Sequence, residues 1–359
     1  MSLSKLVLSH YRNFEVQEWV PSAGVNLVVG RNAQGKTNLL EAVALLSTGR
    51  ILRSVKDDSA AITVGSDVAE VRGEVANSGT ELKVVLRRGQ RRRGYLNGVG
   101  LARTSDLLGR LPTVVFSQLD MAIVRGDASE RRRFLDLELS QMYPVYLRHL
   151  ASYKRALEQR NALLKQAQTM QIGSESFEIW EAQLAEHGLA LRDYRIRFID
   201  ELGRRSQEVH TGLSRGEVLR LAYEVADEIS LEDSLSQGRV RDIHRGSTQT
   251  GPHRDDCAIF VNEKIMRAYG SQGQQRTAVL SLKLATIELV ERALGGPPII
   301  LLDDVLSELD IVRREQLLEA VLQTKTQTVL TCTEADQAGD SIQKNASIFA
   351  VQAGNVTPL

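Results

Sequence analysis

The chain opens with short hydrophobic runs separated by turns, which is typical of a strand-rich N-terminal region. Val25–Val29 is an apolar run of strand length, and a glycine-rich turn follows it. Within Asn38–Leu46 the apolar residues recur with helical spacing, at Leu39, Ala42, Val43 and Leu46. This part of the chain therefore predicts a buried strand, a glycine turn and a helix in that order.

Two other patterns follow along the chain. Val68–Val75 and Glu81–Arg87 alternate apolar and polar residues, as antiparallel strands do. Between residues 120 and 214 the spacing changes to that of long helices. The apolar residues that keep this helical rhythm are Phe177, Trp180, Leu184, Leu191, Tyr194, Phe198 and Leu202. From Thr248 the mixed α/β pattern returns, and it ends in the apolar strand Ile299–Leu302.

These patterns predict an α/β fold with two domains. The simplest arrangement builds one α/β domain from both ends of the chain, residues 1–120 plus 248–359. A mostly helical domain, residues 121–247, is inserted between them, and Leu219–Val225 adds one strand to it. A chain of 359 residues is long enough to bury a substantial core in this way.

Composition narrows the class of protein without indicating a partner. The formal net charge is zero, so a DNA-binding surface would have to come from local clusters of charge. Two cysteines, Cys257 and Cys332, argue against a disulfide framework or a cysteine zinc site and fit a reducing cytosol. The chain starts without the pattern of a signal peptide, and no apolar run approaches the roughly 18 to 20 residues of a membrane span. We therefore expect a soluble, cytoplasmic protein that makes no membrane contact.

The glycine turn is a complete Walker A motif between a strand and a helix, which predicts that the chain binds ATP. Its backbone N–H groups can surround the β- and γ-phosphates at the positive end of the helix. Lys36 would bring a point charge to those phosphates, and the Thr37 hydroxyl would bind Mg²⁺. The eight residues are Gly30, Arg31, Asn32, Ala33, Gln34, Gly35, Lys36 and Thr37. An ordinary glycine turn is the alternative, which the flanking strand and helix make less favourable.

The strand Ile299–Leu302 delivers Asp303 and Asp304 at its carboxyl end, as a Walker B motif does. Asp303 would hold Mg²⁺ with Thr37. Asp304 stands where ABC-type ATPases carry a glutamate that positions the attacking water, so Asp304 and Lys36 are the candidate catalytic residues. The shorter carboxylate predicts slow hydrolysis. Taken alone, the same residues could be a strand end followed by a cap.

Residues 269–276 resemble the ABC signature, with Ser271, Gly273 and Gln274 in the pattern Ser-x-Gly-Gln. A hydroxyl and exposed N–H groups at a helix N-terminus form an anion site, which in that superfamily binds the γ-phosphate held by the opposite subunit. Ser307 and Asp310 occupy the position of the D-loop, which crosses the dimer interface in such proteins. Simple helix capping is the alternative in both places.

A basic cluster is the candidate DNA contact. Its members are Arg87, Arg88, Arg91, Arg92 and Arg93. They could bind phosphates without reading sequence, or they could form a solvated turn. Aromatic residues are only 5% of the chain, and we find none interleaved with the cluster, which favours contacts to the backbone of duplex DNA over base stacking.

Several blocks along the whole chain resemble the RecF family of DNA-repair ATPases. They are Arg12-Asn13-Phe14, Gly35–Ala42, Arg131–Asp136, Gly251–Asp256, Ser271–Arg276 and Leu302–Asp310. The resemblance implies an ABC-type ATPase head like those of SMC proteins and Rad50, without their long coiled coils, and it adds Arg12 to the nucleotide-binding residues. It also implies ATP-dependent homodimerisation, weak DNA-dependent ATP hydrolysis and binding to double-stranded and gapped DNA. Finally, it implies cooperation with RecR and RecO in loading the recombinase RecA, as part of recombination and the SOS response.

Three positions depart from the usual patterns. Gln118 is a candidate Q-loop residue, although the stretch around it differs from the family's. Ala33 replaces a glycine of the Walker A motif. No histidine follows the strand after Walker B, so Thr331 or Thr333 is expected at the position of the ABC switch histidine. The competing interpretations are an ATPase subunit of an ABC transporter and a small-molecule P-loop kinase.

Overall fold

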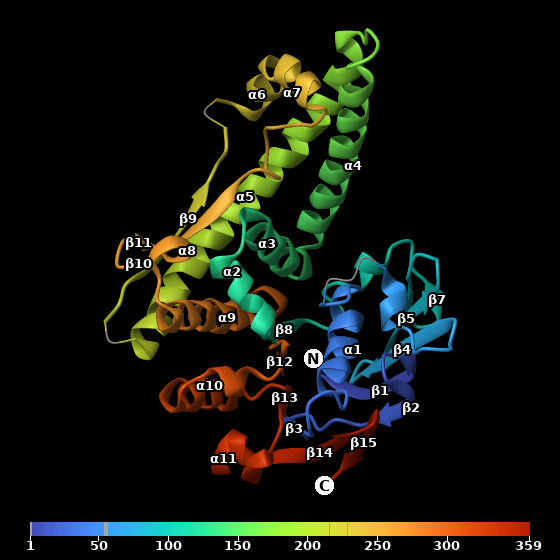
Figure 1. The fold of residues 1–359 in the computed structure, drawn as a ribbon, viewed down its shortest axis with the longest axis vertical. Coiled ribbons are helices and arrows are strands. Elements are labelled where there is room, and N and C mark those ends of the chain that lie inside the picture. Colours follow the sequence, from blue (N-terminus) through green and yellow to red (C-terminus); the bar gives the residue numbers. More distant parts are fainter. Residues whose placement is uncertain (1, 54–56, 215, 228) are drawn as a thin grey trace. The chain divides into compact units, whose positions relative to one another are not determined.

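The chain forms two compact units, shown in the computed structural model of Figure 1, which describes residues 2–53, 57–214, 216–227 and 229–359. Unit 1 comprises residues 1–120 and 286–359, and unit 2 comprises residues 121–285. The sequence analysis placed residues 248–285 in the ATPase domain, whereas in the structure they belong to unit 2. The reason is strand pairing, since β10 (Asp256–Val261) pairs along its whole length with β9 (Leu219–Glu224).

An antiparallel sheet forms one layer of unit 1, with the strand order β2-β1-β4-β5-β6-β7. The alternating stretches predicted from the sequence are confirmed as a hairpin in which Val68 pairs with Arg87 and Val75 with Thr80. The strands are β1 (Leu3–Tyr11), β2 (Phe14–Trp19), β4 (Val68–Val75), β5 (Thr80–Arg87), β6 (Arg93–Leu96) and β7 (Val99–Gly100).

A second sheet of unit 1 has the order β15-β14-β3-β13-β12-β8, and only its edge strand β15 runs antiparallel to its neighbour. The strands are β3 (Val25–Val29), β8 (Thr113–Phe116), β12 (Ile299–Leu302), β13 (Thr328–Cys332), β14 (Ala346–Gln352) and β15 (Asn355–Pro358). Because five strands are parallel, their carboxyl ends meet at one edge, where ligand-binding groups gather in such sheets. The chain segments that follow β3, β8, β12 and β13 therefore lie at that edge.

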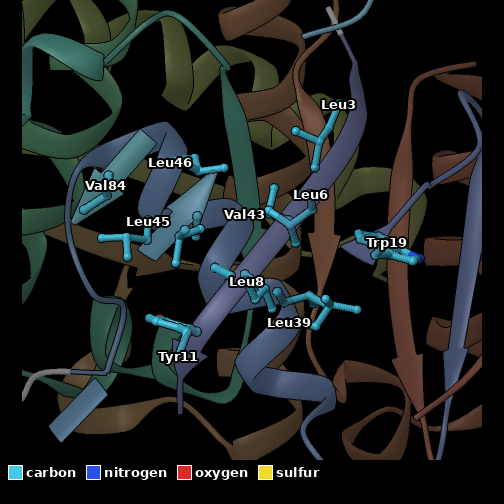
Figure 2. Packing of buried hydrophobic residues seen from close by; sticks show 14 of the residues in the cluster. Leu3, Leu6, Leu8, Tyr11, Trp19, Leu39, Val43, Leu45, Leu46 and Val84 are labelled. Carbon is cyan, nitrogen blue, oxygen red and sulfur yellow. The ribbon is translucent and has the colours of Figure 1, made fainter. Parts of the chain in front are cut away.

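Helix α1 (Lys36–Thr48) packs between the two sheets and is buried over almost its whole length. Its apolar residues meet those of β1 and β5 in one hydrophobic core, which also contains Ile299 and Leu301 of β12 (Figure 2). Figure 2 shows Leu6 and Leu8 of β1 beside Leu39 and Val43 of α1. The core thus joins the N-terminal and C-terminal parts of the chain in one unit.

Unit 1 also contains short 3-10 helices and, within its described residues, two further α-helices. They are η1 (Asp58–Ala61), η2 (Thr104–Leu107), η3 (Gln118–Asp120), η4 (Val305–Glu308), α10 (Ile311–Gln323), η5 (Ala335–Ala338) and α11 (Gly339–Asn345). The long helix α9 (Gln272–Leu294) begins in unit 2 and ends in unit 1.

Unit 2 is mostly helical, as its apolar spacing predicts. Its helices are α2 (Met121–Arg125), α3 (Ala128–Met142), α4 (Pro144–Gln166), α5 (Ser174–Leu213), α6 (Leu231–Gln237), α7 (Arg239–Arg245) and α8 (Met266–Tyr269). Helices α4 and α5 pack side by side as an arm (Figure 1). Phe177, Leu184, Leu191, Phe198 and Leu202 are buried on α5. A small sheet of β9, β10 and β11 (Lys264–Ile265) completes the unit.

One buried cation on α4 joins α5, α6, α7 and the segment at Thr248 to that helix. Arg160 of α4 is fully buried and donates to Asp242 Oδ2 of α7 at 2.7 Å and to Glu181 Oε1 of α5 at 3.0 Å. It also donates to the Thr248 hydroxyl at 2.8 Å and to the Leu235 carbonyl at 3.0 Å. Because Asp242 is equally buried, removing the guanidinium would leave a carboxylate uncompensated in a site of low polarity.

We expect Arg160→Met to lower the free energy of unfolding by about 3–5 kcal/mol, the usual cost of breaking a buried ion pair from one side. Urea unfolding followed by circular dichroism measures the change. Arg155→Met is the matched control because Arg155 is exposed on the same helix, and its cost should stay within about 0.5 kcal/mol. Equal costs for the two variants would show that the Arg160 network contributes nothing to stability.

Candidate nucleotide-binding site

The Walker A segment forms a tight loop between β3 and α1, as the sequence predicts. The backbone of Ala33 and Gly35 has positive φ, 64° and 122°, which turns the chain into the first helical turn. At Gly35 a side chain would meet the amide of Asn13, and at Gly30 it would collide with the carbonyl of Val351. Both glycines are therefore required by close approach of neighbouring chain segments.

Two neighbouring turns hold this loop in place. Asn13, in the turn after β1, donates from its amide to the Gln34 carbonyl at 2.8 Å. The backbone N–H groups of Ala353 and Gly354, in the turn between β14 and β15, donate to the Gln34 side chain at 2.7 Å and to its carbonyl at 3.2 Å. Gln34 was predicted to bind nucleotide, and here its side chain is engaged by the protein. Arg31, Asn32 and Ala33 are exposed at the tip of the loop.

The side chain of Lys36 folds back over the loop. Its Nζ donates to the carbonyls of Gly30, at 2.5 Å, and Arg31, at 3.1 Å. Burial lowers the pKa of Lys36, and the carboxylates of Asp304 and Asp303 oppose that shift. Because the Lys36 side chain is long and flexible, its ammonium group can exchange these carbonyl acceptors for phosphate oxygens.

Thr37 and Asp303 meet at the sheet edge although 266 positions separate them in the sequence. The Thr37 hydroxyl donates to Asp303 Oδ1 at 2.9 Å, and the Thr331 hydroxyl at the end of β13 lies 3.2 Å from the same oxygen. Burial raises the pKa of Asp303, and the hydrogen bonds from Thr37 and Thr331 oppose the rise. A hydroxyl and a carboxylate are the hard oxygen ligands that Mg²⁺ prefers, so this pair could hold the cation.

Asp304, the candidate catalytic carboxylate, follows directly with a left-handed backbone, φ 52°. Its N–H donates to the Thr331 hydroxyl at 2.9 Å, so Thr331 contacts both carboxylate residues. Of the two candidates for the switch position, Thr331 is the one that makes these contacts, while the Thr333 hydroxyl accepts from Gln337. A left-handed backbone is uncommon outside glycine and marks a constrained position.

An ion cluster beside α1 was not foreseen from the sequence. Arg12, with φ 56°, donates to both oxygens of Glu41 at 2.8 and 3.1 Å, and Arg53 donates to Glu41 at 3.1 Å. Burial raises the pKa of Glu41, but the two guanidinium groups outweigh it and hold the pKa below its usual range. The signal in the sequence was a charged residue at 41 within the apolar face of the helix. Arg12, a predicted nucleotide-binding residue, also donates to the Ala60 carbonyl at 2.8 Å.

The candidate Q-loop and D-loop residues follow β8 and β12, at the carboxyl edge of the parallel sheet. Gln118 is exposed in η3, two residues after β8, and the end of β8 accepts a backbone hydrogen bond from Asp303 at 2.8 Å. Ser307 donates to the Asp304 carbonyl at 2.8 Å. Asp310 caps α10 by accepting from the N–H of Arg313 at 3.0 Å. Asp310 is thus a helix cap, and Ser307 stabilises the turn that follows Asp304.

The signature residues belong to unit 2 and form a capping box at the start of α9. The Ser271 hydroxyl accepts from the Gln274 N–H at 3.2 Å, and the Gln274 side chain accepts from the Ser271 N–H at 3.0 Å. Gln274 also donates to Glu217 at 2.6 Å. Ser271 is exposed and Gly273 is half-buried, so the helix N-terminus is accessible within its unit.

The basic cluster divides into two groups. Arg88 donates to the Ser66 carbonyl at 2.8 Å, and Arg92 pairs with Asp58 at 3.1 Å, so these two side chains hold the hairpin to its neighbours. Arg88 is nevertheless exposed to solvent, as are Arg87, Arg91 and Arg93, whose side chains are the remaining members of the cluster. Among the residues that the structure describes, no helix is both long and apolar enough to cross a membrane.

Comparison with known proteins places this geometry in a family. The family model described as RecF/RecN/SMC N terminal domain matches residues 2–357. The chain is 39% identical over 370 residues to the DNA replication and repair protein RecF of Halalkalibacterium halodurans, covering 99% of both chains. It is 38% identical over 369 residues to that of Bacillus subtilis, again covering 99% of both.

Comparison with solved structures supports the same assignment. A chain described as the recombination mediator protein RecF-ATP in the RecFOR pathway superposes with a TM-score of 0.91 at 32% identity, over 99% of this chain and 97% of that one. The Smc head domain of Pyrococcus furiosus superposes with a TM-score of 0.59 at 16% identity over 99% of this chain and 96% of that one, which shows a shared fold alone. The architecture is thus that of the SMC/RecF ATPase heads, α/β with a helical insertion, and the chain belongs to the RecF family.

Proposed function

We propose that this chain is an ATP-gated DNA-repair protein that dimerises on ATP and binds double-stranded and gapped DNA. The observation that carries the ATP part is the contact between Thr37 and Asp303 directly beneath the Walker A loop. The relative with a TM-score of 0.91 is described with ATP and as part of the RecFOR pathway. By that relationship, this chain would cooperate with RecR and RecO in loading the recombinase RecA.

Each residue of the site has a distinct task in this proposal. Lys36 releases the carbonyls of Gly30 and Arg31 and binds the β- and γ-phosphates. Thr37 and Asp303 would hold Mg²⁺, which screens the phosphate charge when bound. Asp304 orients the attacking water, and its short side chain on a constrained backbone accounts for slow hydrolysis.

Dimerisation follows from the incompleteness of each nucleotide site. Ser271 and the N–H groups at the start of α9 form an anion site that we assign to the γ-phosphate held by a second chain. Binding that ligand would compete with the capping box, because the Ser271 hydroxyl now accepts from Gln274. The transporter-subunit alternative finds no support in a chain that matches the RecF family from residue 2 to 357.

We place the DNA contact on the exposed arginines Arg87, Arg91 and Arg93. Three unshielded guanidinium groups near one hairpin would bind duplex phosphates without reading the bases. Arg88 and Arg92 support the hairpin through Ser66 and Asp58. Because the net charge of the chain is zero, binding to DNA phosphates depends on a local cluster of positive charge such as this one.

The first prediction concerns Asp303. Burial raises its pKa in the folded chain above the unfolded value, so its ionisation at neutral pH costs stability, and that cost disappears as the pH falls. Asp303→Asn should therefore leave the chain without nucleotide at least as stable at neutral pH. It should also lose most of the stabilisation by ATP with Mg²⁺, about 2.7 kcal/mol when ATP is at about 100 times its Kd.

Thermal unfolding with and without ATP and Mg²⁺, from mildly acidic to neutral pH, measures both effects. In the native chain the stabilisation by Mg²⁺ and ATP should shrink as the pH falls, because a protonated carboxyl binds the cation poorly. Asp336→Asn, at an exposed carboxylate of the same sheet edge, should behave like the native chain. Full stabilisation of Asp303→Asn by Mg²⁺ and ATP would assign the cation to other residues.

The second prediction tests the composite site. Ser271→Arg should bind ATP through Lys36 but fail to dimerise or hydrolyse it, because the new side chain blocks the anion site. Ser271→Ala removes the hydroxyl, and with it the cap, at a cost of about 1 kcal/mol, but adds no blocking side chain, so it separates lost helix capping from obstruction of the anion site. Sedimentation with ATP, Mg²⁺ and a gapped duplex gives the oligomeric state.

Mixing Ser271→Arg with Lys36→Met sharpens this test. A mixed dimer contains one site in which an intact Walker A motif meets an intact signature, so part of the hydrolysis should return. Dimerisation of Ser271→Arg at the ATP concentration that suffices for the native chain would overturn the composite site. If the mixture recovers no activity and the native chain forms no dimer with ATP, the proposal of ATP-driven pairing fails altogether.

The third prediction concerns duplex DNA. Changing Arg87, Arg91 and Arg93 together to Ala should weaken duplex binding equally for all sequences and reduce the salt slope by about 1 for each phosphate that the chain no longer binds. Fluorescence anisotropy over a range of salt concentrations measures this slope. The control changes the exposed Arg110, Arg148 and Arg155, which removes the same charge elsewhere. Similar losses of affinity in both triple variants would show that net charge, and not a contact at this cluster, determines duplex binding.

A further inference from the structure

A cavity of about 960 Å³ lies in unit 1 beside β6 and β7. Its polar lining includes Arg91, Arg92, Arg93 and Arg103, together with Tyr95 and Asp58. These strands form the edge of the antiparallel sheet opposite to β2, whereas the Walker A loop is held by the turn between β1 and β2. The cavity is therefore separate from the nucleotide-binding site described above.

The charge of this cavity is strongly positive. Arg92 is the one lining arginine with a described ion pair, to Asp58 at 3.1 Å. Among the described residues, no carboxylate forms an ion pair with Arg91, Arg93 or Arg103. Three guanidinium groups around one concave surface repel one another and raise the local concentration of anions. The ligand chemistry that this lining fits best is a group with several negative oxygens, such as phosphate.

The cavity also presents one aromatic ring. Tyr95 and Arg93 are two positions apart on β6, so their side chains lie on the same face of the strand. Gly100 pairs with Tyr95 across the strands, and because it has no side chain it leaves that part of the ring uncovered. Lys83 Nζ lies 4.8 Å from the ring centre. An aromatic ring beside guanidinium groups is the combination that binds a base and its phosphates together.

We propose that this cavity is a second binding site for a phosphorylated nucleoside. The phosphates would bind Arg91, Arg93 and Arg103, and the base would lie against Tyr95. A volume of about 960 Å³ is large enough to enclose such a ligand, since small-molecule sites measure about 300–1,000 Å³. Two sources offer this chemistry: a free nucleotide, and the unpaired end of a nucleic-acid strand.

A duplex fits the interior of this cavity poorly. Its bases are stacked and paired, so Tyr95 could reach none of them unless the helix opened. Duplex phosphates could touch the rim, where Arg91 and Arg93 are exposed, and this is the contact proposed above. Arg103 and Tyr95 belong to the cavity proposal alone. Changing them separates the two proposals in experiment.

Equilibrium binding of ATP to the full chain tests the proposal. The native chain should bind two equivalents, and Lys36→Met, which loses the Walker A site, should bind one. Combining Lys36→Met with Arg103→Ala or with Tyr95→Leu should weaken the remaining binding at least about tenfold, whereas Tyr95→Phe should keep it. Lys36→Met combined with Arg110→Ala, at an exposed arginine outside the cavity lining, should bind like Lys36→Met alone.

A second arm replaces ATP with a short oligothymidylate that carries a 5′-phosphate. Tighter binding of the oligonucleotide identifies a strand end as the source, and tighter binding of ATP identifies a free nucleotide. The proposal is overturned if Lys36→Met binds neither, or if the binding survives Arg103→Ala combined with Tyr95→Leu. A hexaglutamate peptide that binds as tightly as ATP would also overturn it. If the Walker A assignment were wrong, Lys36→Met would bind as many equivalents of ATP as the native chain, which distinguishes that failure from failure of the second site.

Discussion

The burial of α1 between two sheets is the constraint on which the nucleotide-binding site depends. Residues Lys36–Thr48 bring apolar side chains to the antiparallel sheet on one side and to the parallel sheet on the other. Rotating or shifting such a helix would expose core residues at about 25 cal/mol per Å² of apolar surface. The N-terminus of α1 therefore has little freedom. The loop that precedes it, clamped further by Asn13 and by the turn at Gly354, is rigid before any ligand arrives.

Local patterns predicted the parts of the site but not their meeting. The strand Val25–Val29, the glycine turn and the helix after it can be read from spacing alone, because each depends on neighbours in the sequence. The contact between Thr37 and Asp303 spans 266 positions and follows from the strand order, in which β13 separates β3 from β12. The Walker A and Walker B motifs predicted that Thr37 and Asp303 meet, whereas the hydrophobic pattern alone does not predict this contact.

Other features depend on partners that are distant in the sequence. Glu41 binds two arginines from distant segments, and only the folded chain brings Arg12 and Arg53 to it. The boundary near residue 248 was missed for a related reason, since β10 looks like any half-buried strand until its partner β9 is known. At Ser271 the structure shows the helix cap that the sequence left open as an alternative, and the anion-binding role of the same residue stays a proposal.

The Arg160 network also limits how this architecture can change. Arg160 on α4 and Glu181 on α5 flank the outer end of the arm, while Asp242 is carried by a separate segment that returns to β10. Suppose that seven-residue repeats were inserted into α4 before Arg160 and into α5 after Glu181. Arg160 and Glu181 would then move away from Asp242, whose position is set by α7, and the ion pair between Arg160 and Asp242 would be lost. The segment with α6 and α7 thus limits the length of α4 and α5. A change from this short helix pair to a long coiled coil would first require the loss of the ion pair between Arg160 and Asp242.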